Sequence, residues 1–402
     1  MNRTARQRRA WLSRALGVAA GSLLLRTAQA GTPDGAPGES VIAPHYLTTC
    51  RNGPDDFQLV LLDERGNLLH RQALPARAHG AATHAGRGTG CVFARRPGQW
   101  FCAVDLHRPG RLHTVAPPID RRFSGHGVYS ATGARLYTTE SDIDRQRGVV
   151  GVYDVGTGYR RIDEFASEGI GPHEIVRVPG TDLLVVANGG IATHPDVDGG
   201  REPLNLDDMA PSIAVIDGRD GRPLSQHRLP DGQHRISLRH LAVDGARRVW
   251  YAGQYGRADD DRSALPAADT RALAGSFTLA ADGTAAPGGA LAPLLLPDGL
   301  LPGGHGYLSS VASAGDDVLY TAARDGVAFV VDPVARRVVD RQAYSDCSGV
   351  AADARGGYLV SSGTGDLAHL VRDGRWLDLE PLAMTPFAWD NHVGAVRGPD
   401  LY

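Results

Sequence analysis

The chain has 402 residues, a formal net charge of −3 and an apolar fraction of 42%, which is normal for a packed globular protein. Its first thirty residues hold six arginines and no acidic residue, so the rest of the chain carries a formal charge of −9. An acidic domain of this kind argues against nucleic acid as a partner, because nucleic-acid binding requires a basic face.

Residues 1–30 have the features of an export signal. The run RRAWL at 8–12 resembles the twin-arginine export motif, an apolar stretch follows at 15–25, and AQA at 28–30 supplies a cleavage pattern. An ordinary secretory signal and a basic amphipathic helix are the alternatives. We expect a twin-arginine signal peptide over 1–30 and a mature domain over 31–402 in the periplasm. No later apolar run is long enough to span a membrane, so we expect no stable membrane insertion after cleavage.

Internal repeats are the strongest signal in the rest of the chain. Each repeat has a short apolar strand, a tight turn rich in Gly or Asp, a second strand, and then a third strand that ends near Asp, as at 148–154, 212–217 and 326–332. Six such units begin at His79, His126, His173, His240, Ser310 and Gly349. Four-stranded units that recur every 40–50 residues or so are typical of β-propellers, whereas a pair of β-sandwiches does not repeat one turn position so often.

The two chain ends supply a seventh unit. Strands are expected at 40–49, 57–63 and 68–74, and one more at 392–396. We therefore predict an all-β, seven-bladed β-propeller, with the ring closed by a C-terminal strand that joins the N-terminal strands and removes a free sheet edge. Insertions at 189–211 in the fourth blade and 256–275 in the fifth are expected to extend one rim.

Histidines recur at the start of the first strand of the blades. His79, His126 and His173 are spaced 47 residues apart, and equal phase in a repeat means equal position around the central channel. The predicted site contains five histidines and three neighbouring residues: His79, His126, His173, Glu174, His240, Asp346, Cys347 and His392.

A cluster of imidazoles with a thiol and carboxylates suits a transition metal. Imidazole is a common ligand of iron, copper and zinc, and neighbouring imidazoles disfavour joint protonation. The alternative is structural, because a repeated histidine in a propeller often serves only in hydrogen bonding. The expected ligand is iron, copper or zinc, or haem.

A second group of polar residues lies at the ends of the second strands and near the closing strand. It comprises Glu140, Asn188, His194, Gln254, Asp390 and Asn391, and we expect cofactor-binding roles for it. The inferred strand directions place these ends at the rim opposite the histidines unless the connections fold back. Asp390 and Asn391 also suit turns, and Glu140 and Asn188 offer oxygen ligands for a hard cation such as Ca²⁺.

Cys91 and Cys102 flank a predicted hairpin, CVFARRPGQWFC. With a four-residue loop at 95–98, the two cysteines pair across the strands. Both a disulfide and two free buried thiols are compatible with this spacing.

Several runs resemble a family of exported bacterial propellers with a domain of unknown function. They are RRFSGHGVYS at 121–130, the segment 136–154, GIGPHE at 169–174, 185–196, 204–212, 237–243, DCSGVAA at 346–352 and WDNH at 389–392. The resemblance covers nearly all of the mature chain. It implies a seven-bladed propeller in the periplasm with a twin-arginine signal, associated with imelysin-like iron-uptake proteins. The implied partners are periplasmic iron-handling proteins; Cys91 and Cys102 are not part of the shared pattern.

Three functions follow from these observations. The first is a binding protein for a metal ion or haem iron in iron acquisition. The second is a docking scaffold for periplasmic proteins, through the 189–211 insertion. The third is a lactonase-like, metal-dependent hydrolase with Glu140 or Glu174 beside a metal-bound water. Because the sequence contains no recognisable catalytic motif, binding is preferred to catalysis.

Overall fold

The structure, a computed structural model, describes residues 42–257, 272–286, 290–353, 356–373 and 376–396. The predicted signal segment 1–30 lies outside the described residues. The described part of the chain has no helix with the length and hydropathy needed to cross a membrane. Its helical structure consists of four short 3₁₀ turns: η1 (Ala85–Arg87), η2 (Asp198–Gly200), η3 (Leu206–Asp208) and η4 (Ala323–Asp325).

The strands form seven antiparallel sheets of four strands each, which we number as blades from the N-terminus. Blade 1 consists of β28 (Ala388–Ala395), β1 (Tyr46–Arg51), β2 (Phe57–Leu62) and β3 (Leu68–Ala73). Blade 2 consists of β4 (Ala78–His84), β5 (Thr89–Ala94), β6 (Phe101–Asp105) and β7 (His113–Val115). Blade 3 consists of β8 (Arg121–Tyr129), β9 (Arg135–Asp142), β10 (Arg147–Asp154) and β11 (Arg160–Ala166).

The remaining blades follow the same order from the innermost strand outwards. Blade 4 consists of β12 (Pro172–Arg177), β13 (Leu183–Asn188), β14 (Ser212–Asp217) and β15 (Pro223–His227). Blade 5 consists of β16 (Ile236–Val243), β17 (Arg248–Tyr255), β18 (Ala274–Thr278) and β19 (Ala292–Pro293). Blade 6 consists of β20 (Ser310–Ala314), β21 (Asp317–Ala322), β22 (Val327–Asp332) and β23 (Arg337–Ala343). Blade 7 consists of β24 (Cys347–Ala352), β25 (Tyr358–Ser362), β26 (Asp366–Asp373) and β27 (Trp376–Met384).

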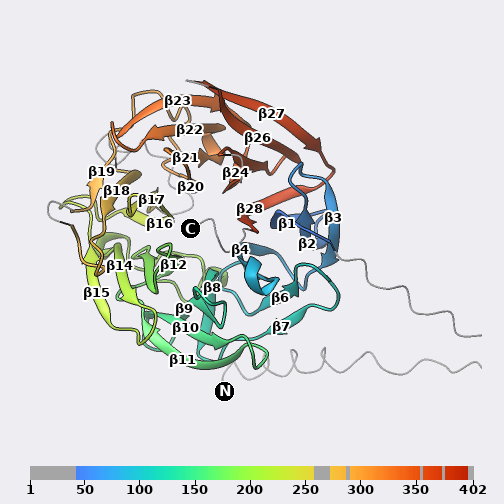
Figure 1. The fold of residues 1–402 in the computed structure, drawn as a ribbon. Coiled ribbons are helices and arrows are strands. Elements are labelled where there is room, and N and C mark those ends of the chain that lie inside the picture. The colour runs from blue at the N-terminus through green and yellow to red at the C-terminus, as the bar shows by residue number, and fades with distance from the viewer. Residues whose placement is uncertain (1–41, 258–271, 287–289, 354–355, 374–375, 397–402) are drawn as a thin grey trace, which may run out of the picture. The chain divides into compact units, whose positions relative to one another are not determined.

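The blades are arranged in a ring around a central channel (Figure 1). Each innermost strand contacts the innermost strands of both neighbouring blades, and β28 pairs with β1 to close the ring. The predicted seven-bladed propeller and its closure by the C-terminal strand are confirmed. The closing strand begins earlier than expected, at Ala388, and the first N-terminal strand begins later, at Tyr46.

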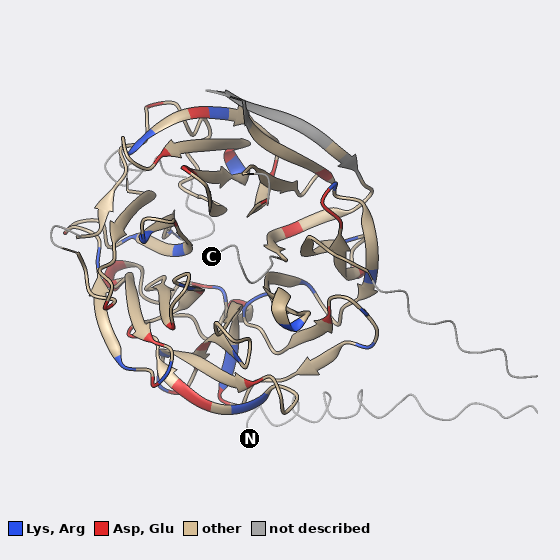
Figure 2. Cartoon of the chain, viewed as in Figure 1, with Lys and Arg blue, Asp and Glu red and all other residues tan. Residues whose placement is uncertain are grey.

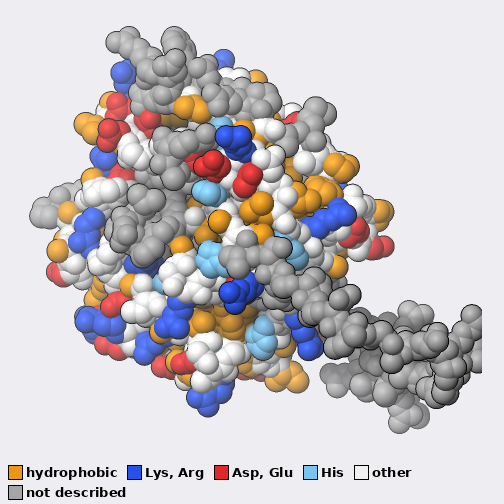
Figure 3. Space-filling view, turned by 45° about the vertical axis from the view of Figure 1, so that its right-hand side comes forward, with side chains coloured by type: hydrophobic (Ala, Val, Ile, Leu, Met, Phe, Trp, Pro, Cys, Tyr) orange, Lys and Arg blue, Asp and Glu red, His pale blue; other side chains and the backbone are white. Residues whose placement is uncertain are grey.

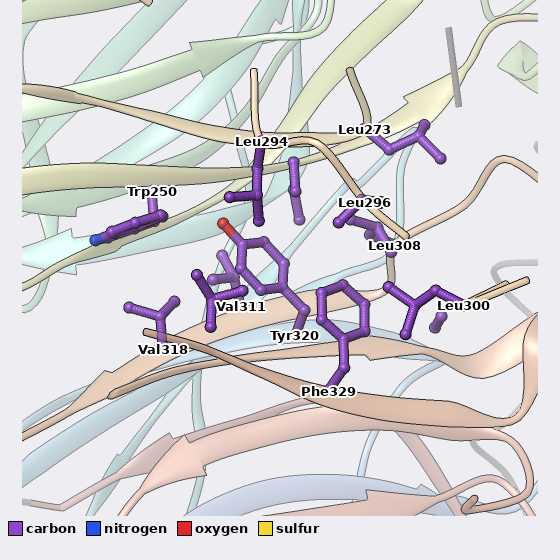
Figure 4. Close-up of a cluster of buried hydrophobic side chains, with 14 of the residues drawn as sticks. Trp250, Leu273, Leu294, Leu296, Leu300, Leu308, Val311, Val318, Tyr320 and Phe329 are labelled. Atoms are coloured by element: carbon purple, nitrogen blue, oxygen red, sulfur yellow. The ribbon is translucent and has the colours of Figure 1, made fainter. Parts of the chain in front are cut away.

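Hydrophobic clusters between adjacent blades hold the ring together. In the cluster between blades 5 and 6, Tyr320 lies between Trp250 and Phe329 (Figure 4), and the rings of Tyr320 and Phe329 stack with centroids 5.2 Å apart. Burial of such aromatic side chains is the main stabilising term in a core of this kind. Charged residues lie mainly on outer strands and connections (Figure 2).

The two predicted insertions fall between the second and third strands of their blades. The connection 189–211 joins β13 to β14 and carries η2 and η3. Most of the connection between β17 and β18, residues 258–271, lies outside the described residues.

Cys91 and Cys102 are free and buried. The hairpin register pairs Cys91 with Ala103 and Val92 with Cys102. This offset of one residue directs the two side chains to opposite faces of blade 2, where they join different hydrophobic clusters. The disulfide alternative is therefore wrong, because successive side chains on a strand alternate between faces.

Candidate functional site

The structure brings five histidines from five blades together at the central channel: His79, His126, His173, His240 and His392. We call these residues the histidine cluster. Consecutive rings around the channel have centroids 4.7–4.9 Å apart. Across the cluster, the rings of His126 and His392 are 4.9 Å apart and those of His79 and His173 are 5.3 Å apart. The rings therefore form one compact group and leave no wide opening between them.

A β-bulge occurs at every strand that supplies a histidine. The pairing register shifts between Ala78 and Ala81 in β4, and between Phe123 and Gly127 in β8. Comparable shifts lie in β12, β16 and β28, at or beside the histidine in each case. A bulge adds a residue to one strand and re-aims its side chain. The bulges therefore account for how these imidazoles, which a regular strand would direct into a sheet face, meet at one place.

Two glycines permit the close approach of β4 and β8. A side chain at Gly80 would lie 2.4 Å from the carbonyl oxygen of Gly125 and 2.9 Å from His126 Nδ1. Gly125 has φ +104°, and a Cβ there would lie 2.7 Å from Cδ2 of His79. Only glycine adopts this backbone conformation without strain and leaves space for the neighbouring imidazole. The pattern of glycines beside histidines thus has a steric origin.

Threonines on second strands fix the backbone of the histidines. The hydroxyl of Thr139 on β9 donates to the carbonyl oxygen of His173 in the next blade at 2.7 Å and lies 3.3 Å from that of His126. Thr48 on β1 donates to the carbonyl oxygen of His392 at 2.9 Å. These buried hydrogen bonds connect strands at the level of the cluster.

All five imidazoles are buried, with exposed fractions of 1–9%. Burial lowers the pKa of each ring because it disfavours the charged form, and neighbouring imidazoles lower the pKa of His79 and His392 further. The pKa of His240 falls to about 3, through burial and the nearby charge of Arg239. The cluster is therefore neutral at physiological pH, the form in which imidazole binds metals.

Glu174 lies beside two of the rings. Its Oε2 is 3.3 Å from His240 Nδ1 and its Oε1 is 3.8 Å from His126 Nδ1. The backbone N–H of Leu241 donates to Oε2 at 2.8 Å and fixes the carboxylate. Burial raises the pKa of Glu174, while His126 and this N–H oppose the shift. A carboxylate at Nδ1 favours the tautomer with its proton on that atom and leaves the Nε2 lone pair free to bind.

The nitrogen atoms of the cluster are suitably placed for a metal ion. Two groups of three, His79 with His126 and His392, and His126 with His173 and His240, each have ligand atoms within 4.8 Å of one another. Six buried ring nitrogens have no hydrogen-bond partner among the described residues: both nitrogens of His79, Nε2 of His126, His173 and His392, and Nδ1 of His240, which is near Glu174 without hydrogen-bond geometry. Unpaired buried polar atoms also occur elsewhere in the described residues, but here six of them come together in one compact group of rings, which suits an ion.

Two predicted site members lie elsewhere. Cys347 is fully buried in the hydrophobic cluster between blades 6 and 7, and burial raises the pKa of its thiol to about 12. Asp346 is exposed at the rim. The strand bulges after Cys347, between it and Gly349, so the thiol faces the blade interior. The structure does not bring this thiol to the imidazoles.

The second group is placed at the same rim as the histidines, not the opposite one. Antiparallel pairing puts Glu140 opposite Phe123, Asn188 opposite Pro172 and Gln254 opposite Ser237. The end of each second strand therefore lies beside the start of the first, and the expected opposite placement was wrong. What separates these residues from the cluster is the direction of their side chains.

Glu140 has partners inside its blade, and Asn188 is bonded to Ser167, which follows the outermost strand of blade 3. Glu140 accepts hydrogen bonds from Thr138 and Tyr153 and pairs with Arg161 at 2.8 Å. The side-chain amide of Asn188 accepts a hydrogen bond from the hydroxyl of Ser167 and donates one to the carbonyl oxygen of Ser167. Both are fully buried, and both hold strands and turns together.

The remaining members lie at other places on this rim. His194 accepts a hydrogen bond from the backbone of Asp196 in the connection 189–211, and Gln254 forms an isolated bridge with Tyr307. Asp390 is buried, accepts from Thr49 at 3.0 Å and pairs with Arg77 at 2.7 Å. Asn391 lines a cavity next to the cluster.

Sequence reasoning missed the arginines of this region. Arg239 precedes His240 in the bulge of β16, and its charge contributes to the lowered pKa of His126, His173 and His240. The position of Arg239 next to the predicted ligand His240 was the sequence feature that could have indicated its role. Histidine, arginine and acidic side chains are visible together around the centre of one face (Figure 3).

Comparison with solved structures supports the fold. The chain is similar to hydrazine synthase of Kuenenia stuttgartiensis, with a TM-score of 0.52 and 14% identity over 88% of this chain and 100% of that chain. It is also similar to a chain of the mitotic checkpoint complex, with a TM-score of 0.53 and 9% identity over 91% of this chain and 88% of that chain. At these identities the likeness concerns the fold alone. No curated protein matches the sequence.

A family profile covers most of the chain. It matches residues 72–396, from the end of blade 1 through all the histidine-bearing strands to the closing strand. The chain therefore belongs to the family described as "Protein of unknown function (DUF1513)".

Proposed function

We propose that the histidine cluster binds one transition-metal ion and that the protein handles iron in the periplasm. The observation that carries the proposal is the set of six buried ring nitrogens without hydrogen-bond partners among the described residues. Leaving a buried polar atom unpaired costs about 1–3 kcal/mol. Coordination of an ion would satisfy several of these atoms at once, since the lone pair of a neutral imidazole is the group that the metal needs.

The ligand set favours iron, copper or zinc. Neutral imidazoles suit all three metals, and Cys347 contributes no thiolate because it lies in the hydrophobic core. Haem between the rings is disfavoured, since centroids separated by 4.7–5.7 Å leave space for an ion but not for a porphyrin. Glu174 would act as an outer partner that orients His240 and His126.

The periplasmic and iron-related parts of the proposal rest on the sequence. The RRAWL run at 8–12 supports export by the twin-arginine route. The resemblance to exported propellers that accompany imelysin-like proteins supports a role in iron acquisition, with periplasmic iron-handling proteins as partners. Replacement of Arg8 and Arg9 by lysine should leave the protein in the cytoplasm. Unchanged periplasmic recovery of that variant would exclude the twin-arginine route.

The metal proposal is tested by isothermal titration calorimetry, in which Fe²⁺, Cu²⁺ or Zn²⁺ is added to metal-free protein. We expect one equivalent to bind to the wild type, and the double variant His126→Ala/His173→Ala to lose this binding. The matched control is His107→Ala/His113→Ala, which removes two exposed histidines outside the cluster.

Folding of the variants is checked separately, by circular dichroism and Tm without metal. The proposal would be refuted if the folded His126→Ala/His173→Ala variant still bound one equivalent of metal tightly. It would also be refuted if the His107→Ala/His113→Ala control lost metal binding to the same extent.

A further inference from the structure

A cavity of about 250 Å³ opens at the rim beside the histidine cluster. We call it the arginine chamber. Its wall comes from blades 1, 2, 6 and 7 and from the segment before β20, and its principal residues are Arg51, Arg77, Arg95, Arg324, Tyr307 and Asn391. The chamber lies near the cluster, because Asn391 immediately precedes His392 and because the pKa of His79, which burial lowers, is lowered further by the charge of Arg95. None of the five histidines is among its lining residues.

Positive charge in the chamber is only partly compensated. Four arginines line it with two acidic residues, Asp346 and Asp390. Asp390 is 2% exposed and is already paired with Arg77 at 2.7 Å. The guanidinium of Arg95 has no hydrogen bond or ion pair to another described residue, and burial together with Arg77 lowers its pKa to about 10. Arg95 stays charged at neutral pH, and the nearby charge of Asp390, which favours that state, is already paired with Arg77. A partly buried cation is therefore incompletely compensated, which is costly.

Other groups add to this cationic environment. The guanidinium of Arg324 lies 4.9 Å from the centre of the Tyr307 ring, which holds it at the chamber wall. Behind the wall, burial and the charges of Arg239 and Arg201 lower the pKa of Arg96 to about 9. Arginines that lower one another's pKa create a field that attracts anions.

The approach from the other end of the propeller differs in charge. The channel there, a cavity of about 310 Å³, is lined mostly by small and apolar residues such as Ala81, Gly127 and Ala312. The fixed charges on its lining belong to Glu174, the carboxylate that contacts the cluster, and to Arg177, which donates to the carbonyl oxygens of Tyr129 and Thr181. One acidic residue and one arginine therefore line this path, whereas four arginines and two acidic residues line the arginine chamber. The chamber is thus the side of the cluster that is better suited to an anion.

We propose that the arginine chamber binds a small polycarboxylate anion. Guanidinium groups bind carboxylates with paired hydrogen bonds, and arginines from separate blades suit an anion whose charged groups are spread over several carbons. If the nearby cluster holds an ion, such an anion could supply an additional oxygen ligand to it. That step rests on the proposed function, whereas the anion site itself does not.

The test uses calorimetry of metal-free protein with citrate, tricarballylate, acetate and inorganic phosphate. We expect the two tricarboxylates to bind more tightly than acetate or phosphate, with affinity that falls as NaCl is added. The double variant Arg95→Gln/Arg324→Gln should weaken citrate binding at least tenfold. The control Arg65→Gln, at an exposed turn of blade 1, should bind citrate as the wild type does.

The His126→Ala/His173→Ala variant separates the two proposals. Retained citrate binding in that variant supports an anion site that is independent of the metal, even if metal binding fails everywhere. Absence of citrate binding to the wild type, phosphate binding as tight as citrate binding, or equal loss in Arg65→Gln would each overturn the polycarboxylate site.

Discussion

Glu174 is a carboxylate that lies beside two of the imidazoles. It contacts His240 and His126 through their Nδ1 atoms and is itself held by the backbone of Leu241. Glu174→Gln keeps the size of the side chain but removes the negative charge that favours the binding tautomer. We expect metal affinity to fall about 10- to 100-fold, measured by competition with a chelator. The same change at the exposed Glu202 should have no effect, and an equal loss there would contradict this role.

Gly125 tests the steric basis of the cluster. Gly125→Ala would introduce both backbone strain at φ +104° and a contact 2.7 Å from the His79 ring. Gly180 is a matched control, since it has φ +70° and a Cβ added there would meet no atom within 4 Å. Strain alone costs about 1–3 kcal/mol at either position. We expect both variants to lower Tm, but only Gly125→Ala to lower metal affinity. Similar metal affinities in the two variants would argue against the close packing of β4 and β8.

At the residue scale, the sequence predicted the positions of the histidines but not the directions of several other side chains. Equal spacing of His79, His126 and His173 was sufficient because repeats impose equal positions around a ring. Cys347 was misplaced, because one residue along a strand reverses the face and the bulge after it is not visible in the sequence. Two partners of Glu140, Tyr153 and Arg161, lie on other strands, the farther one 21 residues away, so its burial could not be read from local sequence.

The bulged innermost strands are the elements that build the site. β20 of blade 6 pairs with β21 without a register shift, and it carries no histidine. β24 of blade 7 also carries no histidine, yet it bulges between Cys347 and Gly349. A bulge therefore accompanies every histidine of the cluster, but a bulge alone does not mark a ligand position. Strand number and blade order were predictable from repeated turns, whereas bulges depend on pairing between strands. The sequence therefore specified which strands line the channel but not how their side chains are re-aimed.

Substitution of Thr139 measures the contribution of the contact between β9 and β12. Its hydroxyl joins β9 to β12 through the carbonyl oxygen of His173. Thr139→Val removes a buried hydrogen bond at nearly constant volume, so we expect a loss of about 0.5–1.5 kcal/mol of unfolding free energy. Urea denaturation measures this loss. Because the bond positions His173, metal affinity should fall in the same variant, and unchanged affinity would show that the blade contact does not position the ligand.

The folding of the whole ring depends on its closure by β28. This strand pairs with β1, packs against β24 and β4, and supplies His392. A chain that ends at Phe387 would expose the edge of β1 and break the ring, so we expect aggregation and loss of cooperative unfolding. A chain that ends at Val396 retains β28 and should unfold as the full chain does. A soluble, cooperatively folded product that ends at Phe387 would contradict this account of closure.

The buried imidazoles also predict how stability changes with pH. Their pKa in the folded protein lies below the value of about 6.5 expected on unfolding. Above pH 6.5 these histidines are neutral in both the folded and the unfolded protein, so they do not change the free energy of unfolding. As pH falls below 6.5 only the unfolded chain gains protons, so metal-free protein should lose about 1.4 kcal/mol per histidine per pH unit.

Urea midpoints at pH 8 and pH 5.5 measure this effect. The His126→Ala/His173→Ala variant should show a smaller difference between the two midpoints than the wild type, because two of the five titrating groups are absent. An equal difference would show that these rings do not titrate as buried neutral groups.

The most direct test of the metal site is elemental analysis of the protein purified from the periplasm after native export. We predict about one equivalent of iron, copper or zinc per chain, and its absence from the exported His126→Ala/His173→Ala variant. A wild-type protein without transition metal that also fails to take one up when it is supplied, or a double variant that retains a full equivalent, would contradict the account.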